Sequence, residues 1–472
     1  MAAQILIKIL SFAFSVLIVR NLGASAFGQY SAVIAFGITF SFLSDLGLGP
    51  YAVREIARLR DQPDGLEKAQ KLYGNILYLR LLLSALTIVL VIVAAWLTNR
   101  PLLMIGAIAL SSLSLLIYSV QGASDAVLAG FERLDISAGA RVINQLAFVV
   151  VGGLALYLGG GYYGLIIATL IAVGLMAVVC WKGVQSLGVR ALKPDKGAWL
   201  HLLRASLPFG IIGFALGLSY KFDTVLLNIY RGDAETGFYN AAYNLVFSMV
   251  LFSNVLNTAL YPSLSRQSVS DPGNLNRSFE RSLRYLMIFA IPSAVGIWVL
   301  ADQIIPFLFT QSFGPAIPAL RIVIWVVPLM FASEFFGYIV VISGKEKIAA
   351  RSVLVSTGLN VLINFFLVPR YGILAAAAMT VATEAVLVGQ YVWVIRKVIG
   401  TFNLWYSLLY PLLSALLMGG LVYALHGGFP LVVNVGIGAL VYVVLLVLFR
   451  VIGKDEIAIL RSLRVRAEKA VP

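Results

Sequence analysis

The chain has 472 residues, of which 60% are hydrophobic and only 12% are charged, and its mean hydropathy is +0.94. A soluble globular protein carries about 25% charged residues, so this chain cannot cover a water-exposed surface of its size. The composition therefore predicts a polytopic membrane protein. One cysteine and two histidines exclude a disulfide framework and argue against a multi-ligand metal site, and we expect neither a metal nor another cofactor.

Apolar runs between polar connections predict an all-α protein with about fourteen membrane-spanning helices. The connections between them are short, which leaves no room for a sizeable domain outside the membrane. In chain order, the predicted spans cover residues 5–22, 30–50, 73–97, 101–121, 139–158, 162–182, 206–229, 237–261, 284–301, 318–342, 352–369, 372–395, 405–425 and 431–449.

The basic residues are distributed unevenly between the connections on the two sides of the membrane. Of 35 Lys and Arg, 28 lie in the connections on one side, 4 lie on the other side and 3 fall inside spans. Because cytoplasmic connections are enriched in Lys and Arg, this predicts a multi-pass protein of the plasma or inner membrane with both termini in the cytoplasm. The net charge of +14 thus reflects topology, and we expect no nucleic-acid partner.

Three pairs of short segments indicate an internal repeat of about 200 residues. Residues 23–32 and 232–241 share the pattern G-x4-G-x-Y-x-A, and each lies in the predicted outer connection between the first two spans of a six-span set. Residues 130–133 resemble 344–347, and residues 163–165 resemble 371–373. Because each copy has an even number of spans, both copies have the same orientation, as in transporters with a pathway between two lobes.

The repeat divides the predicted chain into five parts. Residues 1–185 form the first lobe, residues 186–205 a cytoplasmic linker and residues 206–398 the second lobe. Residues 399–452 hold the last two spans. Residues 453–472 are predicted to form an amphipathic cytoplasmic tail, because apolar positions at helical spacing are flanked by basic residues.

Several segments resemble the flippases of polysaccharide biosynthesis, which belong to the multidrug/oligosaccharidyl-lipid/polysaccharide (MOP) exporter superfamily. The resemblance rests on Val19–Gly23 with Gly28-Gln29-Tyr30, on Asp45-Leu46-Gly47-Leu48 with Val53-Arg54-Glu55, and on Asp223–Leu227 with Gly237–Ala242. It covers essentially the whole chain. It implies a MATE/MOP-like fold, alternating access by two lobes, and transport of a polyprenyl-pyrophosphate-linked oligosaccharide to the outer leaflet.

Ionisable residues within membrane spans usually face a cavity or a partner, because their insertion is unfavourable by about 2.5–3.5 kcal/mol each. A fixed cation in such a cavity could hold a pyrophosphate, which suggests a substrate-binding role for Arg54, Arg80, Lys221, Asp223 and Asp45. Glu334 and Glu384 could carry protons or sodium ions. The alternatives are structural: ion pairs between helices for Lys221 and Asp223, interfacial anchors for the arginines, and helix contacts for the two glutamates.

The leading functional prediction is a flippase for a lipid-linked glycan, with membrane lipids, H⁺ or Na⁺, and glycan-assembly proteins as further partners. A cation-coupled multidrug exporter of the MATE type is the alternative with the same architecture, and a scramblase or scaffold is a third. A membrane enzyme is not expected, because the outer connections are short and His426 is the only histidine among them. The sequence has no G-x4-G-K-[ST] motif, so ion or substrate gradients would drive transport.

Overall fold

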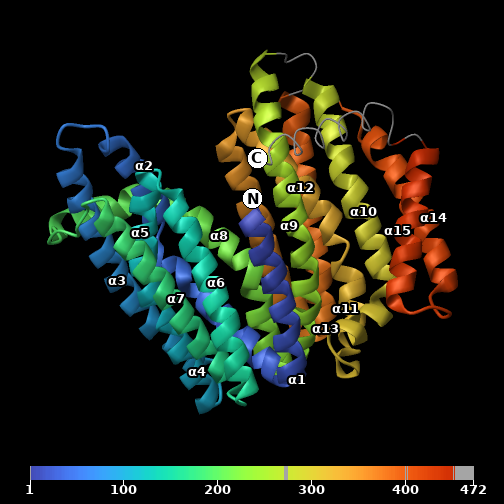
Figure 1. Ribbon diagram of the computed structural model, residues 1–472, viewed down its shortest axis with the longest axis horizontal. Helices are drawn as coiled ribbons and strands as arrows, with labels where there is room; N and C mark the ends of the chain where they lie inside the picture. The colour runs from blue at the N-terminus through green and yellow to red at the C-terminus, as the bar shows by residue number, and fades with distance from the viewer. Residues whose placement is uncertain (1, 271–274, 399, 401, 450, 452–472) are drawn as a thin grey trace, which may run out of the picture. The chain divides into compact units, whose positions relative to one another are not determined.

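A computed structural model of the protein describes residues 2–270, 275–398, 400, 402–449 and 451. The predicted tail, residues 453–472, lies outside the described residues. The described chain consists of helices and short connections and contains no strand (Figure 1), which confirms the predicted all-α class. Its α-helices are α1 (Ala2–Asp45), α2 (Leu48–Leu59), α3 (Gly65–Leu97), α4 (Leu102–Ser112), α5 (Ser114–Gly130), α6 (Leu134–Tyr157), α7 (Gly161–Ser186), α8 (Trp199–Arg231), α9 (Asp233–Ser270), α10 (Leu275–Leu308), α11 (Ala316–Val323), α12 (Val326–Ile342), α13 (Glu346–Val398), α14 (Leu404–Leu425) and α15 (Leu431–Leu448).

Ten helical segments of the described chain are long and apolar enough to cross a membrane. Two of these segments, residues 9–45 and 346–398, are broken by a non-helical glycine, Gly23 and Gly372 respectively, and each therefore provides two crossings. The helices α8 and α9, with 33 and 38 residues, are also long enough to cross. These segments together agree with the predicted fourteen spans.

The repeat is visible in the backbone conformation. Gly23 (φ 71, ψ 176) and Gly232 (φ 85, ψ −176) have nearly identical dihedral angles, in a region that is essentially restricted to glycine. Further residues with positive φ recur at a similar separation, in the pairs Glu132 and Gly344, Gly161 and Gly372, and Gly188 and Gly400. The second half therefore repeats the turns of the first half.

In two of the predicted repeat pairs, the first-copy residue with positive φ lies two or three residues from the one that sequence similarity indicated. Sequence similarity paired Gly130 with Gly344 and Gly164 with Gly372, whereas the positive-φ residues are Glu132 and Gly161 in the first copy. Residues 24–29, expected in the connection between the predicted spans 5–22 and 30–50, are already helical after Gly23. These differences arise because the chain reverses at a single residue with the required φ, which need not be the residue that looks similar.

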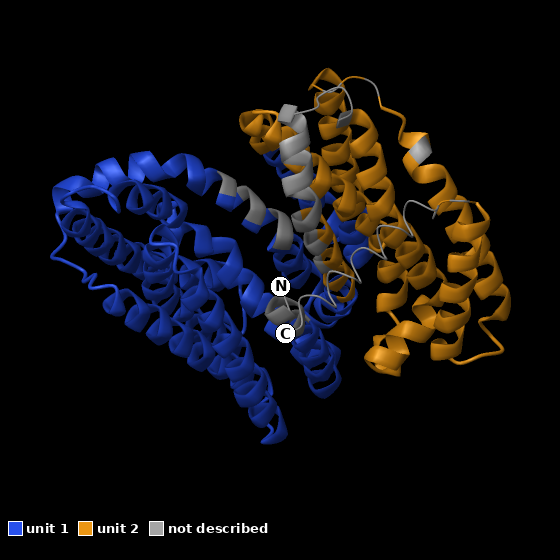
Figure 2. Cartoon of the chain, turned by 45° about the horizontal axis from the view of Figure 1, so that its top comes forward, with its two compact units in different colours: residues 1–244, 353–379 blue, residues 245–352, 380–472 orange. Residues whose placement is uncertain are grey.

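The described chain divides into two compact units that do not follow chain order (Figure 2). Unit 1 contains residues 1–244 and 353–379, and unit 2 contains residues 245–352 and 380–472. The helices α9 and α13 therefore contribute to both units. The predicted lobes, residues 1–185 and 206–398, follow chain order, and their boundaries stay a prediction.

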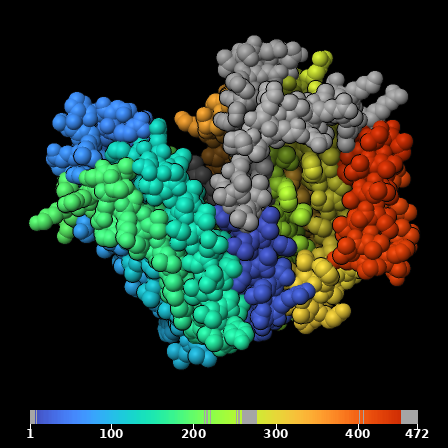
Figure 3. Space-filling view, viewed as in Figure 1, coloured from blue at the N-terminus to red at the C-terminus, as the bar shows by residue number. Residues whose placement is uncertain are grey.

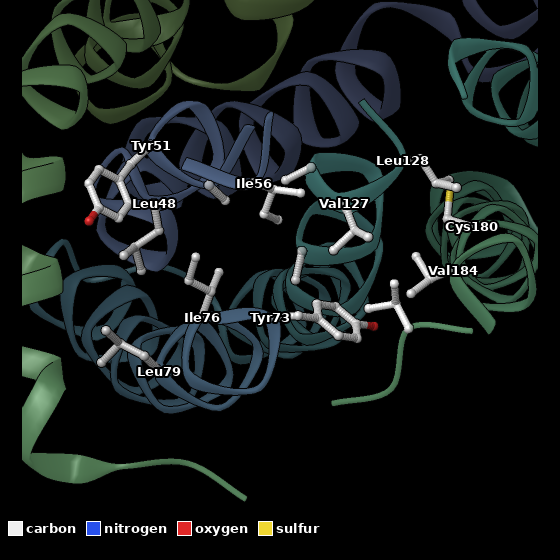
Figure 4. Packing of buried hydrophobic residues seen from close by; sticks show 14 of the residues in the cluster. Leu48, Tyr51, Ile56, Tyr73, Ile76, Leu79, Val127, Leu128, Cys180 and Val184 are labelled. Carbon is white, nitrogen blue, oxygen red and sulfur yellow. The ribbon is translucent and has the colours of Figure 1, made fainter. Parts of the chain in front are cut away.

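The apolar core of unit 1 surrounds a helix that the sequence analysis did not predict. The helix α2 follows Leu46 and Gly47, whose positive φ values (44 and 80) end α1 at Asp45, so the predicted span 30–50 stops early. Its buried face, Leu48, Tyr51, Ala52 and Ile56, has helical spacing. Figure 4 shows this face packed with side chains of α3, α5 and α7, among them Tyr73, Ile76, Leu79, Val127, Leu128, Cys180 and Val184.

Connections assigned to the same side by their charge lie together in unit 1. Arg60, after α2, pairs with Glu132, after α5, at 3.1 Å. On the side predicted to face outward, Arg100 Nη1 donates to the carbonyl oxygen of Asn228 at 3.0 Å, and the Tyr163 hydroxyl donates to the carbonyl oxygen of Leu103. These contacts agree with the predicted grouping of the connections, while the assignment of one group to the cytoplasm remains a prediction.

Exposed apolar side chains cover the outside of the helices. The helix α6, which runs along the face seen in Figure 3, exposes its side chains at Leu146, Val150, Leu154 and Tyr157. The last two helices, α14 and α15, do the same at Leu416, Leu417, Leu440 and Val447. Apolar surface this extensive would aggregate in water, so it identifies the faces of these helices that contact lipid.

Candidate functional site

Arg80 and Asp45 form a buried ion pair within unit 1. Arg80 lies in α3 and Asp45 is the last residue of α1, and Nη1 of Arg80 is 3.0 Å from Oδ1 of Asp45. The arginine side chain is 10% exposed and the aspartate side chain 31% exposed. The same Asp45 oxygen accepts a hydrogen bond from the backbone N–H of Gly49 at 3.1 Å, so Asp45 also holds the first turn of α2.

A glycine in α5 makes room for the Arg80 guanidinium. A Cβ atom placed on Gly122 would lie 2.6 Å from Nη2 and 2.8 Å from Nη1 of Arg80, closer than any real Cβ contact. The Nε atom of Arg80 makes no hydrogen bond within the described chain. The structure thus brings together Asp45 and Arg80, which the sequence analysis named separately. The guanidinium retains hydrogen-bonding capacity beyond the ion pair.

Arg54 occupies a different environment, on the exposed face of α2. Its side chain is 45% exposed and pairs with the adjacent Glu55 at 3.0 Å. Its guanidinium also lies over the rings of Tyr51 and Phe209, at 5.5 and 5.3 Å from their centroids. This amphipathic position fits an interfacial residue, and no contact joins Arg54 to the Asp45–Arg80 pair among the interactions of the described residues.

Asp223 is the most deeply buried of the predicted site residues. It lies in α8 and is 3% exposed. Its carboxylate accepts hydrogen bonds from the Tyr239 hydroxyl of α9 and from the backbone N–H of Thr224, the latter at 2.8 Å. The Thr224 hydroxyl in turn lies 3.3 Å from Oδ1 of Asn240. Asp223 is therefore the centre of a polar network that joins the first two helices of the second repeat.

Lys221 contacts an aromatic ring. Its Nζ lies 5.5 Å from the ring centroid of Tyr243, in α9. Lys221 and Asp223 are two residues apart on one helix, and their opposite charges interact electrostatically. A cation held by a ring face keeps its N–H groups available to an anionic ligand, because the ring accepts none of them as a conventional hydrogen bond.

The two predicted ion-coupling residues lie in unit 2. Glu384, in α13, accepts a hydrogen bond from the hydroxyl of Ser333, in α12, and interacts electrostatically with Glu334, the residue after Ser333. Both carboxyl groups are partly buried. Two neighbouring carboxyl groups beside a hydroxyl provide oxygen atoms that can bind a proton or a sodium ion. Among the described residues, no group of three or more His, Cys, Asp or Glu could hold a metal ion.

Sequence reasoning missed the partners of these charges. Tyr239 and Asn240 were noticed only as members of the repeated motif, although they contribute side chains to the Asp223 network. Asn228 also escaped notice, although polar residues inside apolar spans are themselves a signal of buried hydrogen bonds. The structure places it in α8, with its amide donating to Oδ1 of Asp233 at 2.8 Å.

Comparison with known proteins agrees with this fold. Residues 1–268 match the model of a family described as "Polysaccharide biosynthesis protein", and residues 208–366 match the family "MatE". A protein from Haloferax volcanii, described as "Probable low-salt glycan biosynthesis flippase Agl15", is 23% identical over 439 residues, which cover 91% of this chain and 90% of that protein. "Probable flippase AglR" from the same organism is 23% identical over 42% of each chain.

Solved structures with the same fold include two transporters. The structure described as "Lipid II flippase MurJ, inward closed conformation" has a TM-score of 0.81 and 17% identity, covering 95% of this chain and 98% of that chain. An inward-facing multidrug resistance MATE family transporter of the MOP superfamily has a TM-score of 0.65 and 14% identity, covering 83% of this chain and 94% of that chain. These similarities confirm the predicted MOP-like fold.

Proposed function

Because this chain belongs to the polysaccharide biosynthesis protein family, we propose that it is a flippase that moves a lipid-linked oligosaccharide from the inner to the outer leaflet. The relative described as a glycan biosynthesis flippase, which aligns over 91% of this chain, supports this proposal. The polyprenyl-pyrophosphate carrier implied by the sequence resemblance supplies the anionic group that the site would recognise. The protein acts as a transporter by alternating access, without bond-breaking chemistry.

The observation that carries the proposal is the presence of two shielded cations in the helices of unit 1. Lys221 lies over an aromatic ring, and the guanidinium of Arg80 is 10% exposed. In surroundings with little water, each cation attracts a phosphate far more strongly than it would in bulk solution. Asp45 and Asp223 hold the neighbouring helices in place through hydrogen bonds and, at Asp45, the ion pair. We propose that Arg54, whose side chain is 45% exposed on α2, is the first of these residues to meet the lipid head group.

Glu334 and Glu384 are proposed to couple transport to a proton or sodium gradient. Their proximity to each other and the hydrogen bond from Ser333 support this role. The match of residues 208–366 to the MatE family favours cation coupling and also supports the alternative function, a cation-coupled multidrug exporter. Glu384→Gln is expected to abolish any effect of an ion gradient while leaving passive equilibration of the substrate across the membrane.

A direct test uses proteoliposomes that contain a fluorescent polyprenyl-pyrophosphate oligosaccharide, with a membrane-impermeant quencher that reports the outer leaflet. Lys221→Gln is expected to reduce initial flipping by about 10- to 100-fold, because a charge-assisted hydrogen bond contributes about 1.5–3 kcal/mol. Lys221→Arg is expected to retain most of the activity. Arg321→Gln is the matched control, since Arg321 is 41% exposed and lies 3.8 Å from Asp302 in unit 2.

The assay also decides between the two functions. If the wild-type protein moves cationic drugs and leaves the glycan lipid in place, the exporter is the correct function. If Lys221→Gln and Arg321→Gln flip the glycan lipid at the same rate as the wild type, then the proposed role of Lys221 is wrong. The predicted orientation is tested separately, by labelling single cysteines in the connections with an impermeant reagent after replacement of Cys180, which is the only cysteine of the chain and is buried.

A further inference from the structure

The two copies of the repeated G-x4-G motif contact each other reciprocally within unit 1. A Cβ atom at Gly28 would overlap the backbone carbonyl oxygen of Asp233, and a Cβ atom at Gly237 would overlap that of Ala24. Ala24 and Asp233 each follow the first glycine of their motif, and Gly28 and Gly237 are the second glycines. The second glycine of each motif therefore meets the second residue of the other motif, as in an approximate twofold contact.

Hydrogen bonds cross this contact between helices that are distant in sequence. Gln29 Nε2, in α1, donates to Oδ2 of Asp233 at 2.8 Å. Within the second copy, Asn228 Nδ2 donates to Oδ1 of the same carboxylate at 2.8 Å. Arg100, in the connection after α3, donates to the carbonyl oxygen of Asn228 at 3.0 Å. Asp233 is thus the acceptor that joins the first copy of the repeat to the second.

The composition of this contact suits an interface that opens and closes. It consists of backbone surfaces in close approach and a few polar bonds, so its separation exposes backbone and polar groups that water can satisfy. An interface of large apolar side chains would resist separation in water. In a repeat transporter, the two halves must separate at one end and close at the other during each cycle.

We propose that Ala24, Gly28, Gln29, Asp233 and Gly237 form a gate, here called the glycine gate, that closes the translocation pathway on the side predicted to face outward. This inference rests on the proposed transport function. The glycine at each second motif position is required because any side chain would hold the two backbones apart. Opening of the gate breaks the Gln29–Asp233 hydrogen bond and separates the two glycines.

The test measures gate closure by cysteine crosslinking. Ser25 and Ala234 occupy the third position of each motif and are both exposed, so Ser25→Cys and Ala234→Cys flank the contact without entering it. These substitutions are made in a Cys180→Ala background and treated with a short bis-methanethiosulfonate reagent. The crosslinked protein is expected to lose flipping, and reduction is expected to restore it.

Glycine variants test the mechanism of closure. Gly28→Ala and Gly237→Ala are each expected to lower the crosslinking rate by roughly tenfold, because overpacking typically costs about 1–3 kcal/mol and about 1.4 kcal/mol shifts an equilibrium tenfold. Gly37→Ala, in the same helix as Gly28, is the matched control, since a Cβ atom at Gly37 meets nothing within 4 Å. If Gly28→Ala and Gly37→Ala crosslink at the wild-type rate, the proposal is wrong.

Two further measurements keep the outcome clear. Asp233→Asn removes the charge without adding volume and is expected to lower the crosslinking rate as well. If the rate is unchanged in this variant, the gate proposal is wrong, even if Gly28→Ala does not fold. Crosslinking is measured without any substrate, whereas flipping uses the labelled lipid. A protein that closes at the glycine gate but never moves the glycan lipid contradicts the proposed function, and a crosslinked protein that still flips contradicts the gate.

Discussion

Removal of the Asp45 carboxylate is the perturbation with the largest expected effect on stability. Asp45→Ala leaves the guanidinium of Arg80 with no anionic partner at 3.0 Å, and it leaves the N–H of Gly49 without its acceptor at 3.1 Å. Asp45→Asn removes the charge but retains an oxygen atom for Gly49. The two substitutions therefore separate the ion pair from the hydrogen bond at the start of α2.

The expected magnitude follows from the burial of the two partners. Loss of one partner of a fully buried pair destabilises a protein by about 3–5 kcal/mol. Because Asp45 is 31% exposed, water compensates part of the loss, and we expect about 2 kcal/mol for Asp45→Asn. Asp45→Ala is expected to lose about 1 kcal/mol more, the usual net contribution of one hydrogen bond.

A double-mutant cycle measures this interaction directly. Asp45→Asn, Arg80→Met and the double variant are unfolded reversibly in mixed detergent micelles, with helix content followed by circular dichroism. The double variant is expected to be more stable than the sum of the single effects predicts, by at least about 1.5 kcal/mol, because no uncompensated charge remains in it. Additive effects would refute the view that this pair stabilises unit 1, and so would a decrease in the free energy of unfolding of less than about 0.5 kcal/mol in Asp45→Asn.

Three smaller perturbations probe backbone and packing in the same unfolding assay. Gly122→Ala is expected to lower the free energy of unfolding by about 1–3 kcal/mol, because its Cβ would lie 2.6 Å from a guanidinium nitrogen of Arg80. Gly23→Ala is expected to lower it by about 1–3 kcal/mol through backbone strain alone, since a Cβ there meets nothing within 4 Å. Tyr239→Phe is expected to lower it by about 1–3 kcal/mol, because the buried Asp223 loses a donor.

Each of these three predictions has its own control or its own contradicting outcome. Gly139→Ala, at an exposed helical position with nothing within 4 Å, is the control for both glycine variants and is expected to be neutral or slightly stabilising. If Gly23→Ala behaves like Gly139→Ala, the φ of 71 at Gly23 is not maintained in the membrane. A Tyr239→Phe protein as stable as the wild type would mean that another donor replaces the tyrosine hydroxyl.

The sequence was sufficient to predict the helical class, the number of spans and the repeat, and it singled out the ionisable residues within apolar runs. Each of these is local: an apolar run needs no partner to be recognised, and Arg80, Lys221 and Arg321 are conspicuous within apolar surroundings. The repeat was detectable because the turn glycines, Gly23 and Gly232, tolerate no other residue in their backbone conformation.

The partners of those charges could not be predicted in the same way. Asp45 and Arg80 are 35 positions apart, and they meet because α1 packs against α3 and ends at Asp45, just before two residues with positive φ. Such a helix end depends on Leu46, a residue whose type gives no warning of φ 44. The role of Tyr239 could not be predicted for a related reason. Tyrosine is common at membrane interfaces, and this one donates a hydrogen bond to Asp223 only because α8 and α9 pack together.

The interleaving of the two units has a consequence for biosynthesis. Residues 353–379 belong to unit 1 but are synthesised after residues 245–352, which belong to unit 2. Unit 1 is therefore incomplete when its first 244 residues leave the ribosome, and its last segment is delivered only after most of the chain has entered the membrane. A nascent chain stopped between residues 245 and 352 would expose the surface of unit 1 that residues 353–379 cover. At that stage, membrane chaperones or proteases can recognise an unfinished molecule.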